Sequence, residues 1–242
     1  MKLRETSLAT KAINPSSMGV NDLHNLIGQM EIIGDSHMAS SAETPMRPDA
    51  FDLSADEKIA QIAHKMHEVL HILGMDLNDE SLKGTPLRVA KMYVNEVFGG
   101  LLPENKPDAK LFPNTFKYNE LLVEKNIKVH SYCEHHLVPI VGVAHVAYIS
   151  NGFVIGLSKI NRIVRYFSKR PQVQERLNEQ IAAELKKALK TEDVAVLIDA
   201  EHFCVKTRGI EDDHSSTLTA HYSGRFKEID LKNEFLKHVY KS

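Results

Sequence analysis

The order of strand-like and helix-like segments in residues 114–242 most constrains how this chain can fold. Two segments rich in valine, isoleucine and tyrosine predict a first strand pair, and Asn151-Gly152 is a turn signal after the second of them. Two segments with helical patterns follow, and then a second strand pair and a short helix near Phe235. The six segments are residues 121–132, 142–149, 158–167, 171–189, 194–205 and 215–226. Their order, β-β-α-α-β-β, predicts an α+β fold.

A helical region is predicted over residues 49–113, ahead of these strands. Ser54 and Glu57 have the spacing of a capping box, and the apolar residues that follow recur at helical spacing. Thr85 as N-cap and Pro86 at the first helical position predict the start of a second helix. We expect the two helices to form an antiparallel pair.

The first 48 residues are expected to form a flexible arm. They mix serine, asparagine, glycine and methionine with single charges, and their one apolar patch, residues 23–33, is short. We assign the arm no role.

Composition excludes several classes of function. With 43% hydrophobic and 26% charged residues, the 242-residue chain has the composition of an ordinary globular protein. A net charge of -2 gives no global reason to bind nucleic acid or an anionic membrane. No segment approaches the roughly 20 apolar residues of a membrane span, and the first residues lack the apolar core of a signal peptide. We therefore expect a cytoplasmic protein with a small partner.

Both cysteines of the chain lie beside histidines. Cys133 and His136 have a spacing that lets both bind one ion, and strand periodicity would turn His202 and Cys204 to the same face. Three such ligands, with a spare histidine, favour a catalytic zinc ion whose fourth position is left to water. The alternatives are a disulfide or two buried thiols. The metal site is favoured over both, because thirteen histidines scattered over the chain would rarely place four of them beside the cysteines.

A second group of polar residues predicts an anion site. Ser158 at an expected N-cap, with Lys159 beside it and Arg162 one turn on, could seat a phosphate, although a plain capped helix explains the same residues. In a strand continued past Cys204, Arg208 and Lys206 would extend the face that carries His202. This convergence favours a polyanionic substrate.

Gln174 and Glu175 lie in the first turn of the helix expected over residues 171–189. A carboxylate there complements the helix dipole, which is its simplest explanation. The alternative is recognition of guanine, because Glu can accept both the N1 and N2 hydrogens of the base while the neighbouring amide serves the carbonyl.

Four ordered motifs closely resemble the signature segments of type I GTP cyclohydrolase. They are residues 133–136, 155–162, 170–177 and 202–209. The resemblance includes residues 85–93 and extends from about residue 44 to the C-terminus, so the arm alone is unmatched. After Arg208 the chain departs from the family's dense run of Ser and Thr, because Asp212, Asp213 and His214 precede Ser215.

The resemblance implies the tunnelling fold, an antiparallel sheet backed by two helices, with residues 114–242 as the catalytic domain. It implies a homodecamer with active sites between subunits. The implied zinc ligands are Cys133, His136 and Cys204. The implied catalytic residues are His135, His202 and Ser158. The implied substrate-binding residues are Gln174, Glu175, Lys159, Arg162 and Arg208, with Arg88 and Lys91 from an adjacent subunit.

The implied reaction is hydrolytic opening of the imidazole ring of GTP, release of formate and recyclisation to 7,8-dihydroneopterin triphosphate, the first step of pterin and folate biosynthesis. One alternative is a nitrile reductase of the same fold, in which a cysteine would attack the substrate. Another is a regulatory protein with structural zinc, which would bind GTP without turnover.

Overall fold

The computed structural model describes residues 18–35 and 41–240, and the chain divides into two units, residues 1–40 and 41–242. In the first unit, helix α1 (Val20–Asp35) occupies part of the expected arm, where the sequence analysis assigned no helix. Val20, Ile27 and Met30 on α1 are exposed. Residues 1–17 and 36–40 of the arm lie outside the described residues, and the flexibility of the arm stays a prediction.

The second unit begins with the predicted helical pair. Helix α2 (Ala55–Ile72) starts at the expected capping box, in which Ser54 Oγ accepts from Glu57 N at 3.3 Å and Glu57 Oε2 accepts from Ser54 N at 2.8 Å. Helix α3 (Thr85–Lys91) has Gly84 as its N-cap, so the prediction of Thr85 was wrong by one residue. Ile59 of α2 packs with Ala90 of α3, which confirms the pair.

The segment after α3 remains helical in other forms before the sheet begins. A π-helix, η2 (Met92–Val97), is followed by two 3₁₀ turns, η3 (Gly99–Leu101) and η4 (Pro103–Asn105). Strand β1 (Leu111–Pro113) then pairs antiparallel with β4 (Phe153–Ile155) in a small separate sheet.

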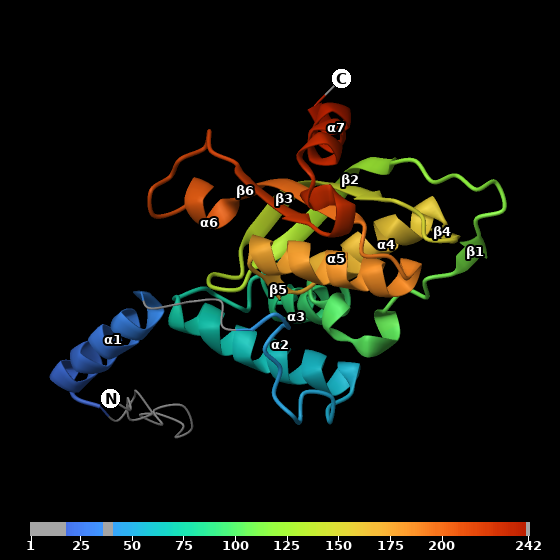
Figure 1. The fold of residues 1–242 in the computed structure, drawn as a ribbon. Helices are drawn as coiled ribbons and strands as arrows, with labels where there is room; N and C mark the ends of the chain where they lie inside the picture. Colours follow the sequence, from blue (N-terminus) through green and yellow to red (C-terminus); the bar gives the residue numbers. More distant parts are fainter. Residues whose placement is uncertain (1–17, 36–40, 241–242) are drawn as a thin grey trace, which may run out of the picture. The chain divides into compact units, whose positions relative to one another are not determined.

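The main sheet has five strands in the order β5-β2-β3-β6-β7 (Figure 1). Strand β3 pairs antiparallel with both β2 and β6, and β7 pairs antiparallel with β6. The short β5 alone runs parallel to its neighbour, β2. The strands are β2 (Leu122–Cys133), β3 (Pro139–Tyr148), β5 (Pro171–Gln172), β6 (Val194–His202) and β7 (Thr217–Tyr222).

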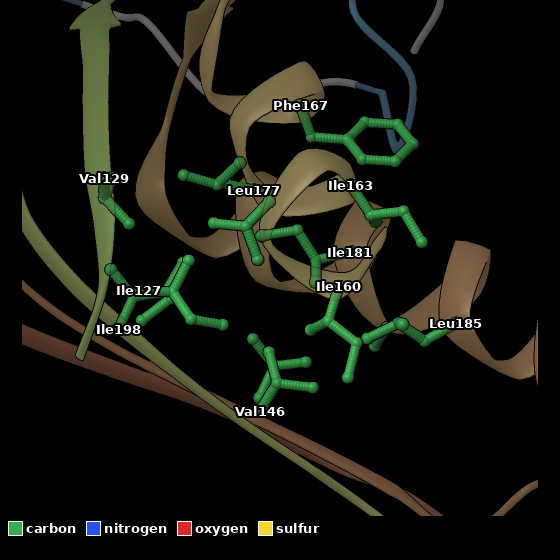
Figure 2. Packing of buried hydrophobic residues seen from close by; sticks show 14 of the residues in the cluster. Ile127, Val129, Val146, Ile160, Ile163, Phe167, Leu177, Ile181, Leu185 and Ile198 are labelled. Carbon is green, nitrogen blue, oxygen red and sulfur yellow. The ribbon is translucent and has the colours of Figure 1, made fainter. Parts of the chain in front are cut away.

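Helices cover both faces of this sheet (Figure 1). Helices α4 (Leu157–Ser168) and α5 (Gln174–Leu189) pack on one face, where Ile160 and Ile181 are fully buried against β-strand residues such as Val146 (Figure 2). The 3₁₀ turn η5 (Gly224–Lys227) and helix α7 (Ile229–Tyr240) cover the other face through Phe226 and Phe235. These layers confirm the predicted antiparallel sheet backed by two helices.

Two predicted boundaries were wrong for reasons of strand pairing. The helix expected from residue 171 begins at Gln174, because Pro171 and Gln172 pair with the end of β2. The strand expected over 194–205 ends at His202, which pairs with Ile140 near the start of β3. Beyond His202 no further residue of β3 pairs with β6, and the chain forms a short helix, α6 (Phe203–Lys206).

Within residues 18–35 and 41–240, no helix combines the length and the apolar character needed to cross a membrane.

Candidate metal centre and active site

Cys133, His136 and Cys204 converge at one end of the main sheet. One potential ligand atom from each lies within 4.8 Å of the other two, and no other group of three or more such side chains was found among the described residues. His136 Nδ1 lies 3.9 Å from Cys133 Sγ. The three side chains come from the end of β2, the connection to β3, and α6, so the predicted ligand set is brought together by the fold.

Pairing by β3 brings the two cysteines together. Its first residues pair with the end of β2, as Pro139 does with Tyr132, and with the end of β6, as Ile140 does with His202. Cys133 is the last residue of β2, and Cys204 lies two residues beyond the end of β6. The predicted reason for their convergence, a strand that turns His202 and Cys204 to one face, was wrong, because α6 begins at Phe203.

A tight turn holds the connection between β2 and β3. Cys133 N donates to Val138 O at 2.9 Å, and Leu137 N donates to Cys133 O at 2.9 Å. Leu137 has φ +52°, a left-handed conformation that costs a branched residue energy and closes this turn. The turn places His135 and His136 beside Cys133.

The donor set fits zinc. Both cysteines are free thiols, Cys133 is buried and Cys204 is partly buried. Burial, and then the neighbouring Cys133, raise the pKa of the Cys204 thiol. Both effects favour the neutral thiol, and a divalent cation shared by the two sulfurs would reverse them. Two sulfurs and one imidazole nitrogen match zinc in a site that keeps one position for another ligand.

Arg208 lies beside this group. Its Nη1 is 2.7 Å from His136 Nε2, and a guanidinium has no acceptor, so Arg208 is the donor. The predicted proximity of Arg208 to the metal centre is confirmed, although the chain reaches it through α6. Lys206 instead forms an ion pair with Glu201 at 3.0 Å.

His202 is held by Gln174. His202 Nε2 and Gln174 Oε1 lie 2.7 Å apart, and the Gln174 amide nitrogen donates to the carbonyls of Ile198 at 3.1 Å and Thr217 at 2.8 Å. The amide oxygen is therefore the acceptor, and His202 carries a proton on Nε2. Burial lowers the pKa of His202, and the Glu175 carboxylate partly opposes this. Gln174 is buried, whereas Glu175 is exposed.

Glu134 and His135 complete the surroundings of Cys133. His135 Nδ1 lies 3.6 Å from Cys133 Sγ, and its Nε2 lies 3.8 Å from Glu134 Oε1. Arg176 forms a two-pronged ion pair with the Glu134 carboxylate. Neither Glu134 nor Arg176 had a predicted role. The signal for Arg176 is an arginine in the first turn of a helix, where the dipole disfavours a cation.

The phosphate-binding candidates on α4 lie away from this group in the same chain. Asn161, in the second turn of α4, donates to Glu124 Oε1 at 3.0 Å near the start of β2. Cys133 lies nine positions beyond Glu124 along β2, roughly 30 Å. Figure 1 likewise shows β4, which precedes α4, and α6 at opposite ends of the sheet. Ser158, Lys159 and Arg162 therefore belong to a different region of the chain's surface.

Ser158 is also not the N-cap of α4. The cap residue is Gly156, which makes no side-chain cap hydrogen bond, and Ser158 is an exposed residue inside the helix. The prediction of a capping hydroxyl was wrong by two residues.

Arg88 and Lys91 lie on α3, and both are exposed. Arg88 Nη2 donates to Ser81 O and Thr85 Oγ1, each at 3.0 Å. In the segment after α6, Asp212 accepts from His214 N at 3.0 Å, so this departure from the family pattern makes a local turn.

The fold and the side chains at the sheet end define an α+β protein of the tunnelling-fold class with a candidate Cys-His-Cys metal centre. The family model for GTP cyclohydrolase I matches residues 62–240. This chain belongs to the GTP cyclohydrolase I family.

Individual relatives agree with the family model. The chain is 60% identical over 210 residues to GTP cyclohydrolase 1 of Flavobacterium johnsoniae, which covers 87% of this chain and 94% of the relative. It is 53% identical over 185 residues to the enzyme of that name from Vibrio parahaemolyticus, with 76% and 84% covered. The relative from Salmonella gallinarum is 46% identical over 216 residues, with 89% and 97% covered.

Proposed function

We propose that this protein is a zinc-dependent GTP cyclohydrolase. It opens the imidazole ring of GTP by hydrolysis, releases the ring carbon as formate and recyclises the product to 7,8-dihydroneopterin triphosphate, the first step of pterin and folate biosynthesis. The observation that carries the proposal is the convergence of Cys133, His136 and Cys204 in a chain of this family.

Zinc is the proposed ion, held by these three side chains. When bound, it acts as a Lewis acid and lowers the pKa of a coordinated water to about 7. The two free cysteines fit a reducing compartment, in which thiolates stay available to a metal, and support a cytoplasmic location.

His202 and His135 are the proposed proton carriers. Burial lowers the pKa of His202 and so favours the neutral ring, which can take a proton from the attacking water and return it to the departing ring nitrogen. Gln174 fixes the ring by accepting the Nε2 proton. His135, whose Nδ1 lies 3.6 Å from Cys133 Sγ, is the second proposed carrier.

Glu175 is the proposed acceptor for the N1 and N2 hydrogens of guanine. It is exposed, and its charge acts on His202, so a base bound there would lie beside the proton carrier. Gln174 was expected to help by binding the guanine carbonyl. Both N–H groups of its amide already donate within the chain, so it would bind the guanine carbonyl only by giving up one of these hydrogen bonds.

The triphosphate site is proposed to be shared between subunits. Arg208 lies beside His136 and is proposed to bind the triphosphate in the same subunit that holds the metal. Ser158, Lys159 and Arg162 lie towards the other end of the sheet, so they are proposed to act, with Arg88 and Lys91, in the site of a neighbouring copy. Ser158 is also proposed to assist rearrangement of the ribose. The homodecamer implied by the family resemblance would supply such neighbours.

The test is incubation of the purified protein with GTP, with formate and the pterin chromophore measured together. Formation of both in the zinc-loaded protein, and loss of both after chelation, supports the proposal. Stoichiometric GTP binding without either product would contradict it and would favour a regulatory protein.

A further inference from the structure

Arg176 is a buried cation in an unfavourable position. Its side chain is 3% exposed, and it lies in the first turn of α5, where the helix dipole disfavours positive charge. A buried charge is costly unless partners compensate it. The presence of a buried arginine at this position therefore needs an explanation other than stabilisation of α5.

All three guanidinium nitrogens of Arg176 have partners. Nη1 and Nη2 bind the two carboxylate oxygens of Glu134, the second at 3.2 Å, and Nε donates to Ser41 O at 2.9 Å. The partners lie in two different segments. This planar, forked arrangement suits a guanidinium and cannot be reproduced by a lysine ammonium.

Glu134 connects Arg176 to the metal ligands. It lies between Cys133 and His135, its carboxylate is 3.8 Å from His135 Nε2, and its backbone N donates to Gln172 O at 3.0 Å. The turn that contains Glu134 also carries His136. A carboxylate fixed by two hydrogen bonds therefore limits how far this turn can move.

We infer that Arg176 is a positioning residue that acts through Glu134 to hold the Cys133–His136 turn in the geometry that binds the metal. The inference rests on the proposed function only in taking zinc as the ion. Groups that orient metal ligands typically contribute about 10–100-fold to metal affinity or activity. Arg176 itself touches neither metal nor substrate in this role.

The experiment measures zinc affinity in competition with a chromophoric chelator. The variants are Arg176→Met, Arg176→Lys, Glu134→Gln and the double variant Arg176→Met/Glu134→Gln, each checked for folding by circular dichroism. Lys106→Met is the control, because Lys106 forms a 2.6 Å ion pair with Glu184 of the same helix α5 and lies outside the site.

We expect Arg176→Met to weaken zinc binding by about 10–100-fold, Arg176→Lys to weaken it less, and Lys106→Met to leave it unchanged. The double variant should lose no more than the larger single loss, because both substitutions break the same connection. The double variant leaves no unpaired buried charge, so it can still be measured if Arg176→Met does not fold.

Wild-type affinity in a folded Arg176→Met or double variant would overturn the inference, as would losses that multiply in the double variant. Failure of the proposed function is a separate result, because it would appear as weak or absent zinc binding, or no turnover, in the wild-type protein.

Discussion

His202 and Gln174 form a 2.7 Å hydrogen bond that joins the end of β6 to the first turn of α5. The amide of Gln174 is itself fixed by two backbone carbonyls, so it sets both the orientation of the imidazole and the nitrogen that carries the proton. In the proposed mechanism, this amide would hold the imidazole for proton transfer, whether or not it also binds the base.

Substitution of Gln174 separates these two roles. Loss of His202 orientation should lower kcat, and His202→Ala sets the upper limit, about 10²–10⁴-fold for a general acid or base. We expect Gln174→Ala to lower kcat by less than His202→Ala, with a small change in KM for GTP. Steady-state kinetics checks this. A large rise in KM with normal kcat would assign Gln174 to guanine binding instead.

Removal of a metal ligand should abolish turnover. Cys204→Ser takes one of three ligands from the group, and we expect loss of bound zinc and of formate release from GTP. Metal analysis of the purified variant and a formate assay measure both. Full activity in zinc-free Cys204→Ser protein would contradict the mechanism.

The stability of the protein should fall at mildly acidic pH, in part through His145. Burial, and then the charge of Lys125, lower the pKa of His145, and Asp199 partly opposes them. Its contribution is complete above the ordinary histidine pKa of about 6.5 and is lost as the pH falls towards the lowered pKa, because the unfolded chain binds the proton more readily.

His145→Leu should therefore flatten the dependence of unfolding free energy on pH between 7 and 5, by at most about 1.4 kcal/mol per pH unit. Urea unfolding at a fixed protein concentration measures the slope. The pKa of His202 is lowered as well, so some dependence should persist in the variant. An unchanged slope would show that His145 titrates alike in both states.

The two serines near helix starts should differ in their effect on stability. Ser54 caps α2 through the bond to Glu57 N, so Ser54→Ala should cost about 1 kcal/mol. Ser158 makes no cap bond in α4, so Ser158→Ala should change the free energy of unfolding by less than about 0.5 kcal/mol. Equal losses in thermal or urea unfolding would contradict this assignment.

Truncation of the core beneath the helices should be costly. Ile181 of α5 is fully buried (Figure 2), so Ile181→Ala should destabilise the protein by about 2–5 kcal/mol. Val69→Ala on α2 is the control, because Val69 is 48% exposed, and its effect should be within about 0.5 kcal/mol. Urea unfolding of both variants tests the difference, and similar losses would argue against this packing.

Local signals in the sequence predicted the elements, and non-local pairing set their ends. The capping box of Ser54 and Glu57 needs neighbours three residues apart, so the start of α2 was predictable. The end of β6 at His202 depends on where its partner β3 begins. Periodicity within residues 194–205 contains no information about that partner.

The same distinction separates the predicted and missed parts of the site. The spacing of Cys133 and His136 and the family resemblance predicted which side chains would converge with Cys204. The bond from Arg176 to Glu134 spans 42 positions, and Gln174 reaches a carbonyl 43 positions away at Thr217. Both depend on the packing of α5 against strand ends.

Because β3 gathers the ends of β2 and β6, an ion bound by Cys133 and Cys204 would join two residues 71 positions apart, 204 minus 133, that only the folded chain brings together. An ion that binds the native state and not the unfolded chain shifts the unfolding equilibrium towards the native state. The ion would thus stabilise the native fold in addition to supplying chemistry. Resistance to heat should therefore increase with metal occupancy, even in an inactive variant that keeps its metal ligands.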